Sequence, residues 1–110
     1  MKTIPIYKHG EVVAQAQVDD EDYDRMSRGR WKLSGYGYAI RKSTLALDGV
    51  RHRLLFMHRE VLGLEFGDGV QTDHLNGERL DNRRANLRAV SASEHASRHH
   101  ADRRAGRELG

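Results

Sequence analysis

Two runs of alternating apolar and polar residues open the chain and restrict how its first part can fold. The alternation covers residues 3–7 and 11–18, and the pair His9-Gly10 lies between them. Because successive side chains on a strand point to opposite faces, such runs predict two strands that each bury one face. A glycine in the connecting pair favours a tight turn. We therefore expect a β-hairpin at the N-terminus.

The residues after this hairpin predict a series of short elements. Asp19 or Asp20 is a good N-cap, and the acidic residues that follow suit the positive end of a helix dipole. We expect a helix to about residue 27, strands over 31–33 and 36–41, a polar loop over 47–49, a strand over 50–56 and a helix over 57–62. Trp31 is expected in the core, and His58 is interpreted as a packing residue in the last of these helices.

Charge is distributed unevenly along the sequence. The net charge is only +3, with hydrophobic residues at 37%, so the core must be thin and the surface well solvated. Five acids lie within residues 19–24, which leaves the remainder of the chain more basic. This balance favours a polyanionic partner such as nucleic acid, although a charged surface that only maintains solubility has the same composition.

Several classes of protein are excluded by residues that the sequence lacks. The chain contains no cysteine, which excludes disulfide scaffolds, cysteine zinc fingers and thiol chemistry. No apolar run approaches the roughly 20 residues that a membrane-spanning helix needs. The first seven residues also lack the apolar stretch of a secretory signal. We expect a cytoplasmic protein with no membrane partner.

Residues 72–100 concentrate groups that bind metals and transfer protons. Asp73 ends a predicted strand over residues 70–73, His74 follows it directly, and Asn76-Gly77 predicts a tight turn. A helix is expected over residues 91–103, because Ser91 and Glu94 fit a capping box. His95 and His99 are four residues apart and share one face of that helix, whereas His100 points away from it.

This pattern suits phosphodiester hydrolysis, which requires a base to activate water and a cation to neutralise developing charge. Asp73 and His74 point to opposite faces of a strand, so one can turn to a metal and the other to the attacking water. A single Asp-His pair is commonplace, however, and Asn82 or Asn86 alone would be turn or capping residues. The joint order of these motifs makes the pattern specific.

The stretch Asp-His-Leu-Asn-Gly followed by Leu-Asp-Asn-Arg-Arg-Ala-Asn-Leu-Arg resembles the HNH nuclease family, in particular its phage and homing-type branch. The resemblance is close over residues 70–88, extends into the last helix and includes weaker similarity upstream. It implies an α+β chain, with a strand-rich part over residues 1–49, a ββα-metal nuclease unit over 50–105 and a flexible tail over 106–110. It also implies a phage-infected or bacterial cell as the setting.

The resemblance further implies roles for individual residues. His74 would be the general base, Asp73 a metal ligand, and Asn86 the residue that ties down the loop backbone and orients the base. His95 would be the second ligand, where the phage branch commonly has Asn, and His99 an extra one. Mg²⁺ or Mn²⁺ is the expected ion, although imidazole ligands also suit Zn²⁺, Ni²⁺ or Co²⁺. Asn82 is interpreted as structural.

Double-stranded DNA is the expected partner. Arg83, Arg84 and Arg88 could grip phosphates, and Arg41 and Lys42 could flank the backbone near the predicted strands. One such site would nick duplex DNA as a monomer, and a homodimer could cut both strands. Two alternatives stay open: a non-catalytic DNA-binding module with an HNH-like fold, and a structural metal-binding domain.

Overall fold

The N-terminal hairpin has the predicted strands and turn. In this computed structural model, which describes residues 1–65 and 68–91, β1 (Lys2–Lys8) pairs antiparallel with β2 (Glu11–Val18). His9 and Gly10 have φ angles of 52° and 82°, and left-handed conformations at both central residues match the twist of two-residue hairpins. Ile4 and Ile6 point inward and are fully buried, which confirms the alternation.

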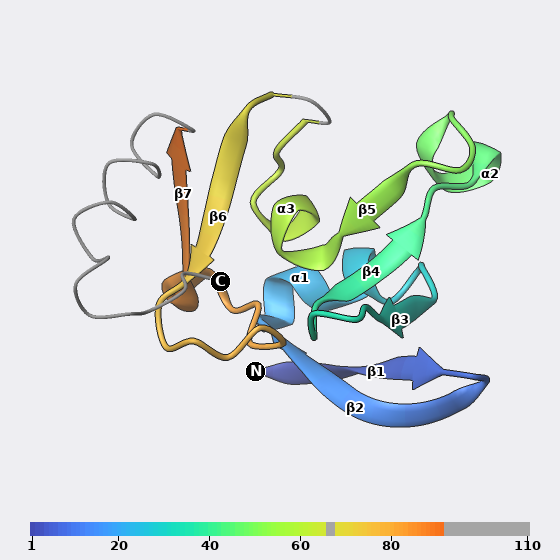
Figure 1. Cartoon of the computed structure of the whole chain (residues 1–110), viewed down its shortest axis with the longest axis horizontal. Helices are drawn as coiled ribbons and strands as arrows, with labels where there is room; N and C mark the ends of the chain where they lie inside the picture. The colour runs from blue at the N-terminus through green and yellow to red at the C-terminus, as the bar shows by residue number, and fades with distance from the viewer. Residues whose placement is uncertain (66–67, 92–110) are drawn as a thin grey trace.

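The hairpin belongs to a five-stranded sheet with the strand order β2-β1-β3-β4-β5. β3 (Trp31–Leu33) runs parallel to β1, and β4 (Ala39–Lys42) and β5 (Leu54–Phe56) continue the sheet antiparallel. β4 and β5 are shorter than the strands predicted over residues 36–41 and 50–56. The sheet rises in Figure 1 from the blue hairpin through β3 and β4 to β5.

Two short helices, α1 and α2, connect strands of this sheet, and a third, α3, follows its last strand. α1 (Asp20–Met26) follows the N-cap Asp19, as predicted, and α3 (Met57–Val61) begins directly after β5. The loop predicted over residues 47–49 is wrong, because α2 (Leu45–Asp48) lies there. The Thr44 side chain caps α2 by accepting a hydrogen bond from the Leu47 amide at 3.3 Å. Gly49 ends the helix with a φ of 75°.

The core lies between the sheet and helices α1 and α3. Trp31 is 1% exposed, which confirms its predicted place, and its indole Nε1 donates to the Met26 carbonyl at 2.7 Å. Met57 and Val61 of α3 pack into the same cluster. Leu87 also belongs to this cluster, although it comes much later in the sequence. The second half of the chain therefore shares the core of the first.

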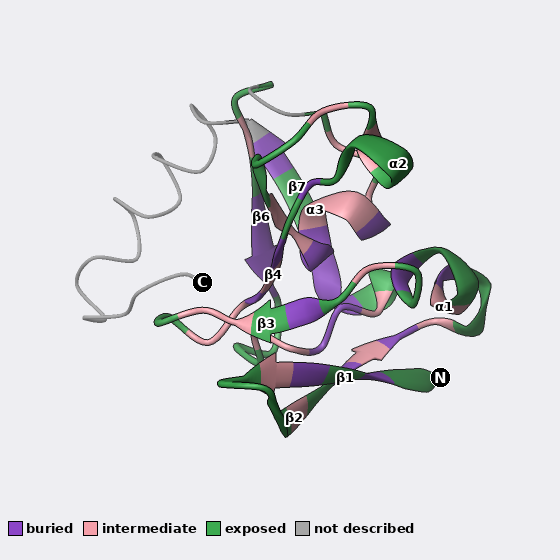
Figure 2. Ribbon diagram, turned by 90° about the vertical axis from the view of Figure 1, so that its right-hand side faces the viewer, coloured by how far each residue is buried: buried purple, intermediate pink, exposed green. Residues whose placement is uncertain are grey.

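A separate two-stranded sheet carries the Asp-His pair. β6 (Val70–His74) pairs antiparallel with β7 (Leu87–Ser91), and a loop containing the 3₁₀ helix η1 (Arg84–Asn86) joins them. Figure 1 shows this hairpin on the far side of α3 from β5. The last residues of β6 are buried, as the purple segment of this strand in Figure 2 shows.

The loop between β6 and β7 reaches back to the N-terminal hairpin. The Gln17 amide donates to the Leu80 carbonyl at 2.8 Å, and the Asn82 amide donates to the Gln17 carbonyl at 2.8 Å. Gln17 also forms an isolated parallel bridge with Asp81. The free edge of β2 is thus extended by three residues of the loop, which fixes the loop relative to the core.

The predicted α+β class is confirmed, with more strand than helix. The ββα-metal unit stays a prediction, because Ser91 ends β7 and the remainder of the helix predicted over residues 91–103 lies outside the described residues. The division at residue 49 also stays a prediction, although β5 pairs with β4 across it. Over residues 1–65 and 68–91, none of the helices has the length and apolar character needed to cross a bilayer.

Candidate active site

Asp73 and His74 end β6, in register with two residues of β7. His74 pairs with Leu87 and Asp73 pairs with Arg88. Residues opposite one another in an antiparallel ladder share a face, so His74 lies on the same face as the core residue Leu87. Both site residues are buried, with 5% exposure for His74 and 3% for Asp73. The sequence predicted a base that faces water, and the structure instead directs it toward the interior.

The side chain of Asn82 holds one nitrogen of His74. Its Oδ1 lies 2.8 Å from the Nε2 of His74, and Asn82 has no exposed surface. The His74 Nδ1 is buried and has no hydrogen-bond partner among the residues that the structure describes. From the sequence, Asn82 is interpreted as a structural residue, and its contact with His74 was not predicted. Its only signal was an amide side chain in the loop that follows the Asn-Gly turn.

Aromatic rings surround the other sides of the imidazole. The His58 ring lies edge-on to His74, with centroids 5.0 Å apart and an interplanar angle of 82°. Tyr38 contacts both histidines, with centroid distances of 5.9 Å to His74 and 5.3 Å to His58. Phe56 completes the group at 5.4 Å from His58. The packing role predicted for His58 agrees with its burial, and His74 is one of the rings it packs against.

Both histidines are neutral near physiological pH. Burial lowers the pKa of His58 to about 3, and the nearby His74 and Arg59 add to this effect. Burial also lowers the pKa of His74, although the hydrogen bond to the Asn82 side chain and the charge of Asp81 oppose the shift. A neutral imidazole keeps a lone pair on one nitrogen, which is the form that can accept a proton.

Asn86 connects two points of the loop between β6 and β7. Its Nδ2 donates to the Asp81 carbonyl at 2.9 Å, and its Oδ1 accepts from the Asn76 amide at 3.0 Å. Asp81 in turn accepts from the Nδ2 of Asn76 at 2.9 Å and from the guanidinium of Arg83 at 2.7 Å. These bonds hold the loop that presents Asn82 to the base.

The match to a known family covers this arrangement. Residues 52–97 match the family model described as HNH endonuclease. This segment belongs to the HNH endonuclease family. It contains α3, β6, η1 and β7, and therefore His58, His74 and both asparagines of the site. No curated protein and no solved structure matches the chain significantly.

Three of the five arginine and lysine residues predicted to contact DNA form ion pairs in the structure. Arg83 binds both oxygens of Asp81, and Arg84 binds both oxygens of Asp22 at 2.8 and 2.9 Å. These ion pairs raise the pKa values of both guanidinium groups. Each guanidinium remains partly exposed, with 41% and 45% of the side chain accessible. Both guanidinium groups therefore remain accessible to a DNA phosphate.

Arg41 differs from this expectation, because it is a buried residue outside the HNH segment. It is 8% exposed and bonds to Asp48 at 2.7 Å and to Glu60 at 2.9 Å. Its hydrogen bond to Asp48 is the main reason that its pKa is raised. The phosphate contact predicted for Arg41 stays a prediction, and these two ion pairs would compete with it. Lys42 and Arg88 are exposed, without an ion-pair partner in residues 1–65 and 68–91.

Of the predicted metal ligands, the structure describes only Asp73. His95 and His99 of the HNH segment and its flank lie outside the described residues, as does His100. A different acidic group gathers at α1, where oxygen atoms of Asp19, Glu21 and Asp22 lie within 4.8 Å of one another. Arg84 and Arg25 already bind Asp22, and the Arg84 amide donates to Asp19. Arginine therefore balances this group, which contains none of the predicted ligands.

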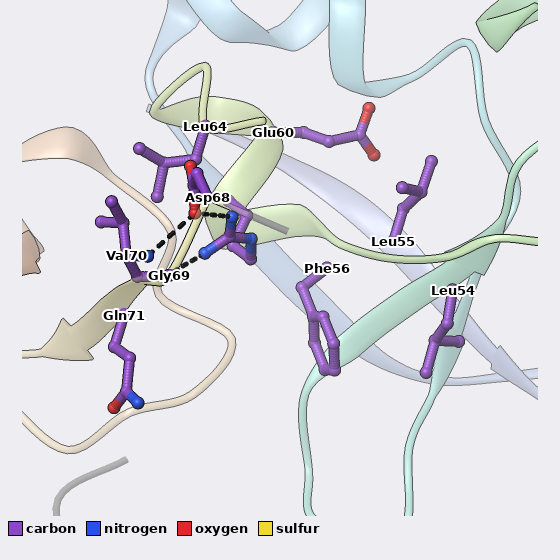
Figure 3. Close-up of a pocket in the computed structure, with 10 residues that line it drawn as sticks. Leu54, Leu55, Phe56, Glu60, Leu64, Asp68, Gly69, Val70 and Gln71 are labelled. Carbon is purple, nitrogen blue, oxygen red and sulfur yellow. Dashed lines mark hydrogen bonds and ion pairs between the residues drawn. The ribbon is translucent and has the colours of Figure 1, made fainter. Parts of the chain in front are cut away.

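A cleft of about 360 Å³ lies away from these residues, between β5 and the start of β6. Leu54 and Phe56 form one wall, with Leu64 and Val70 across from them, as the close-up in Figure 3 shows. Asp68 accepts from Arg59 at 2.7 Å and from the Val70 amide at 2.9 Å, which fixes one side of this cleft. Neither Asp73 nor His74 lines it, so the cleft is not part of the candidate site.

Proposed function

We propose that the chain is a metal-dependent endonuclease that hydrolyses phosphodiester bonds in DNA, with His74 as the general base. One observation carries the proposal. Inside a segment of the HNH endonuclease family, a neutral imidazole adjoins Asp73 and is bonded through Nε2 to Asn82. With Nε2 engaged, Nδ1 is the atom that would remove a proton from the attacking water.

The donor set fits a divalent cation. Asp73 supplies a carboxylate oxygen, the ligand type that Mg²⁺ and Mn²⁺ prefer, and we assign His95 and His99 as the further ligands. Imidazole ligands also suit Zn²⁺, Ni²⁺ or Co²⁺, so the working ion is part of the proposal. When bound, the cation would neutralise charge that develops on the phosphate and on the leaving oxygen. The products would carry 5′ phosphate and 3′ hydroxyl ends.

Because His74 is buried, the proposed function requires a change of conformation. The Nδ1 atom of His74 has no exposed surface, so water and phosphate reach it only if neighbouring residues move when DNA binds. Hydrogen bonds at active sites often tighten only in the complex with substrate, and a buried base in the free protein fits such a change.

Double-stranded DNA is the proposed substrate, bound through exposed basic side chains. Arg88 lies opposite Asp73 in the ladder of β6 and β7, which places a cation beside the proposed metal ligand. Arg83, Arg84 and Lys42 would make further phosphate contacts that are not specific to sequence. A monomer would nick one strand, and a homodimer could cut both.

Cleavage of supercoiled plasmid tests the proposal directly. The full chain is incubated with plasmid in Mg²⁺, in Mn²⁺ and in EDTA, beside His74→Ala and the control His9→Asn at an exposed turn. We expect relaxed circles with metal, none with EDTA, and a loss of at least about 100-fold in His74→Ala only, because a general base contributes roughly 10²–10⁴ in rate. Cleavage by His74→Ala at the wild-type rate would contradict the assignment.

A second function, DNA binding without cleavage, is favoured by one observation. His74 is 5% exposed, and Asn82 and His58, which both contact it, are buried as well. Such a residue can stabilise the fold without chemistry. This function requires that the wild type bind duplex DNA, that His74→Ala bind equally well, and that no metal support cleavage.

A further inference from the structure

We infer that Asn82 is a positioning residue that selects the tautomer of His74, and that the N-terminal strand β2 holds it in place. The inference rests on the proposed function, because it names the atom that would accept the proton. It adds a residue and a strand to the site, and neither was singled out for catalysis in the sequence.

The first step concerns the contact between the two side chains. The Oδ1 atom of Asn82 lies 2.8 Å from His74 Nε2, and a carbonyl oxygen can only accept. In the amide orientation that the structure records, Nε2 therefore carries the proton of the neutral ring. The lone pair is then on Nδ1, which makes no hydrogen bond within the described part of the chain. The bond thus leaves the proton-accepting nitrogen available.

The second step concerns the rigidity of Asn82. Its own amide donates to the Gln17 carbonyl of β2 at 2.8 Å, while the Gln17 amide donates to Leu80 at 2.8 Å. On the other side of the loop, Asn86 donates to the carbonyl of Asp81, the residue directly before Asn82. Backbone bonds to β2 and a side-chain bond from η1 therefore fix the Cα of Asn82 from two directions.

The third step concerns the position of the ring. A hydrogen bond to Asn82 at one edge leaves rotation of the ring about that bond open, and the rings of Tyr38 and His58, with centroids at 5.9 and 5.0 Å, limit this rotation. Replacing Asn82 by an apolar residue would keep these ring contacts and remove only the acceptor. The tautomer is then the property that changes most.

Nuclear magnetic resonance of the ¹⁵N-labelled full chain tests the inference without any metal or DNA. Long-range correlations from the ring protons report which nitrogen of a neutral histidine is protonated, and His74→Ala identifies the His74 signals. We expect the Nε2-protonated form in the wild type above pH 7. A wild type with the proton on Nδ1, or with both forms mixed, would overturn the inference before any variant of Asn82 is made.

Two substitutions and one control complete the test. Asn82→Leu should give a mixture of both tautomers, whereas Asn82→Asp should keep the Nε2-protonated form because its carboxylate still accepts. The control is Thr72→Val on the same strand, since Thr72 is buried and its hydroxyl has no partner among the described residues. An Asn82→Leu spectrum identical to that of the wild type would overturn the inference.

Cleavage rates separate this inference from the proposed function. In an active enzyme, Asn82→Leu should lower kcat by about 10- to 100-fold with little change in KM, which is part of the roughly 10²–10⁴ that a general base contributes. Asn82→Asp should recover most of that loss. If the wild type never cleaves DNA, the proposed function fails, and the tautomer spectra still decide the role of Asn82.

Discussion

The imidazole of His58 lies edge-on to that of His74, with ring centroids 5.0 Å apart. His58 lies in helix α3, which packs on the core of the five-stranded sheet, and His74 ends strand β6 of the separate two-stranded sheet. Their proximity places two buried, neutral histidines in one aromatic group with Tyr38 and Phe56. Their burial also makes the stability of the protein depend on pH in a predictable direction.

The free energy of unfolding should fall as the pH is lowered below 6.5. His58 has its pKa lowered from 6.5 to about 3 in the folded state, so below pH 6.5 the unfolded chain binds a proton that the folded chain excludes. The loss should approach about 1.4 kcal/mol for each pH unit between these two values. Urea denaturation at pH 7.5 and 5.0 measures it.

A variant that lacks only His58 isolates this effect. In His58→Leu the carboxylates and His74 still titrate, so the difference between the two pH slopes belongs to His58. The stability of the variant should depend less on pH than that of the wild type. Equal slopes in both proteins would show that folding does not lower the pKa of His58.

Replacement by glutamine should destabilise the protein at Arg41 but leave its stability nearly unchanged at the neighbouring Lys42. Arg41→Gln leaves Asp48 and Glu60 without their shared cation, and we expect a loss of about 2–4 kcal/mol in the free energy of unfolding, somewhat below that for a fully buried pair. Lys42→Gln should change stability by less than about 0.5 kcal/mol. Chemical denaturation compares them.

DNA binding provides the second half of this comparison. Lys42→Gln should weaken binding to any duplex and reduce the slope of log affinity against log salt by about 1. Arg41→Gln, measured where it is still folded, should leave that slope unchanged. A reduced slope for Arg41→Gln would show that Arg41 contacts a phosphate, as the sequence predicted.

Asp22 should be the acid of α1 whose loss matters most. It is 1% exposed and accepts hydrogen bonds from Arg25 and Arg84, and these bonds hold its pKa below the usual value of 3.8. Asp22→Asn should cost about 1–3 kcal/mol at neutral pH, as expected for hydrogen bonds to a charged group. The stabilisation is present above pH 3.8 and is lost as the pH falls through the lowered pKa.

Glu21 is the matched control, because its side chain is 70% exposed and only 3.9 Å from Arg84 at its nearest. Glu21→Gln should change stability by less than about 0.5 kcal/mol. A double-mutant cycle of Asp22→Asn with Arg84→Ala should show a coupling of about 0.5–3 kcal/mol. Additive effects would mean that the ion pair contributes nothing beyond its separate side chains.

Asn86→Ala should loosen the loop between β6 and β7 without unfolding the sheet. The substitution removes two hydrogen bonds of a residue that is 7% exposed, and we expect a loss of about 1–3 kcal/mol. Hydrogen exchange should accelerate at the amide of Asn76, which loses its acceptor. Unchanged exchange there would contradict the bond.

The sequence predicted those parts of the fold that local signals determine. The alternation and the His9-Gly10 turn were sufficient for β1 and β2, and Gly63, a typical helix stop, marked the end of the short helix α3. α2 was missed although Thr44 and Gly49 are ordinary capping residues, because its four residues show no apolar period. Short helices of this kind are visible only through their ends.

Contacts between distant segments could not be predicted in the same way. Nothing local indicates that Gln17 bonds to the backbone of residues 80 and 82, or that Arg41 turns inward to Asp48 and Glu60. The chemistry of the site was recognisable because its motif is contiguous. The residues that shape it, Asn82 and His58, depend on tertiary packing and were assigned only structural roles.

The hydrogen bonds between Gln17 and the loop of residues 80–82 limit which fragments of this protein can keep their structure. A fragment that begins at residue 52 would contain the whole family match, yet the backbone of residues 80 and 82 would lose the strand that it is bonded to. Leu87 would lose the residues of β1 and β3 that belong to the same hydrophobic cluster. Transplanting the nuclease motif into another scaffold would therefore require the first hairpin to be transferred with it.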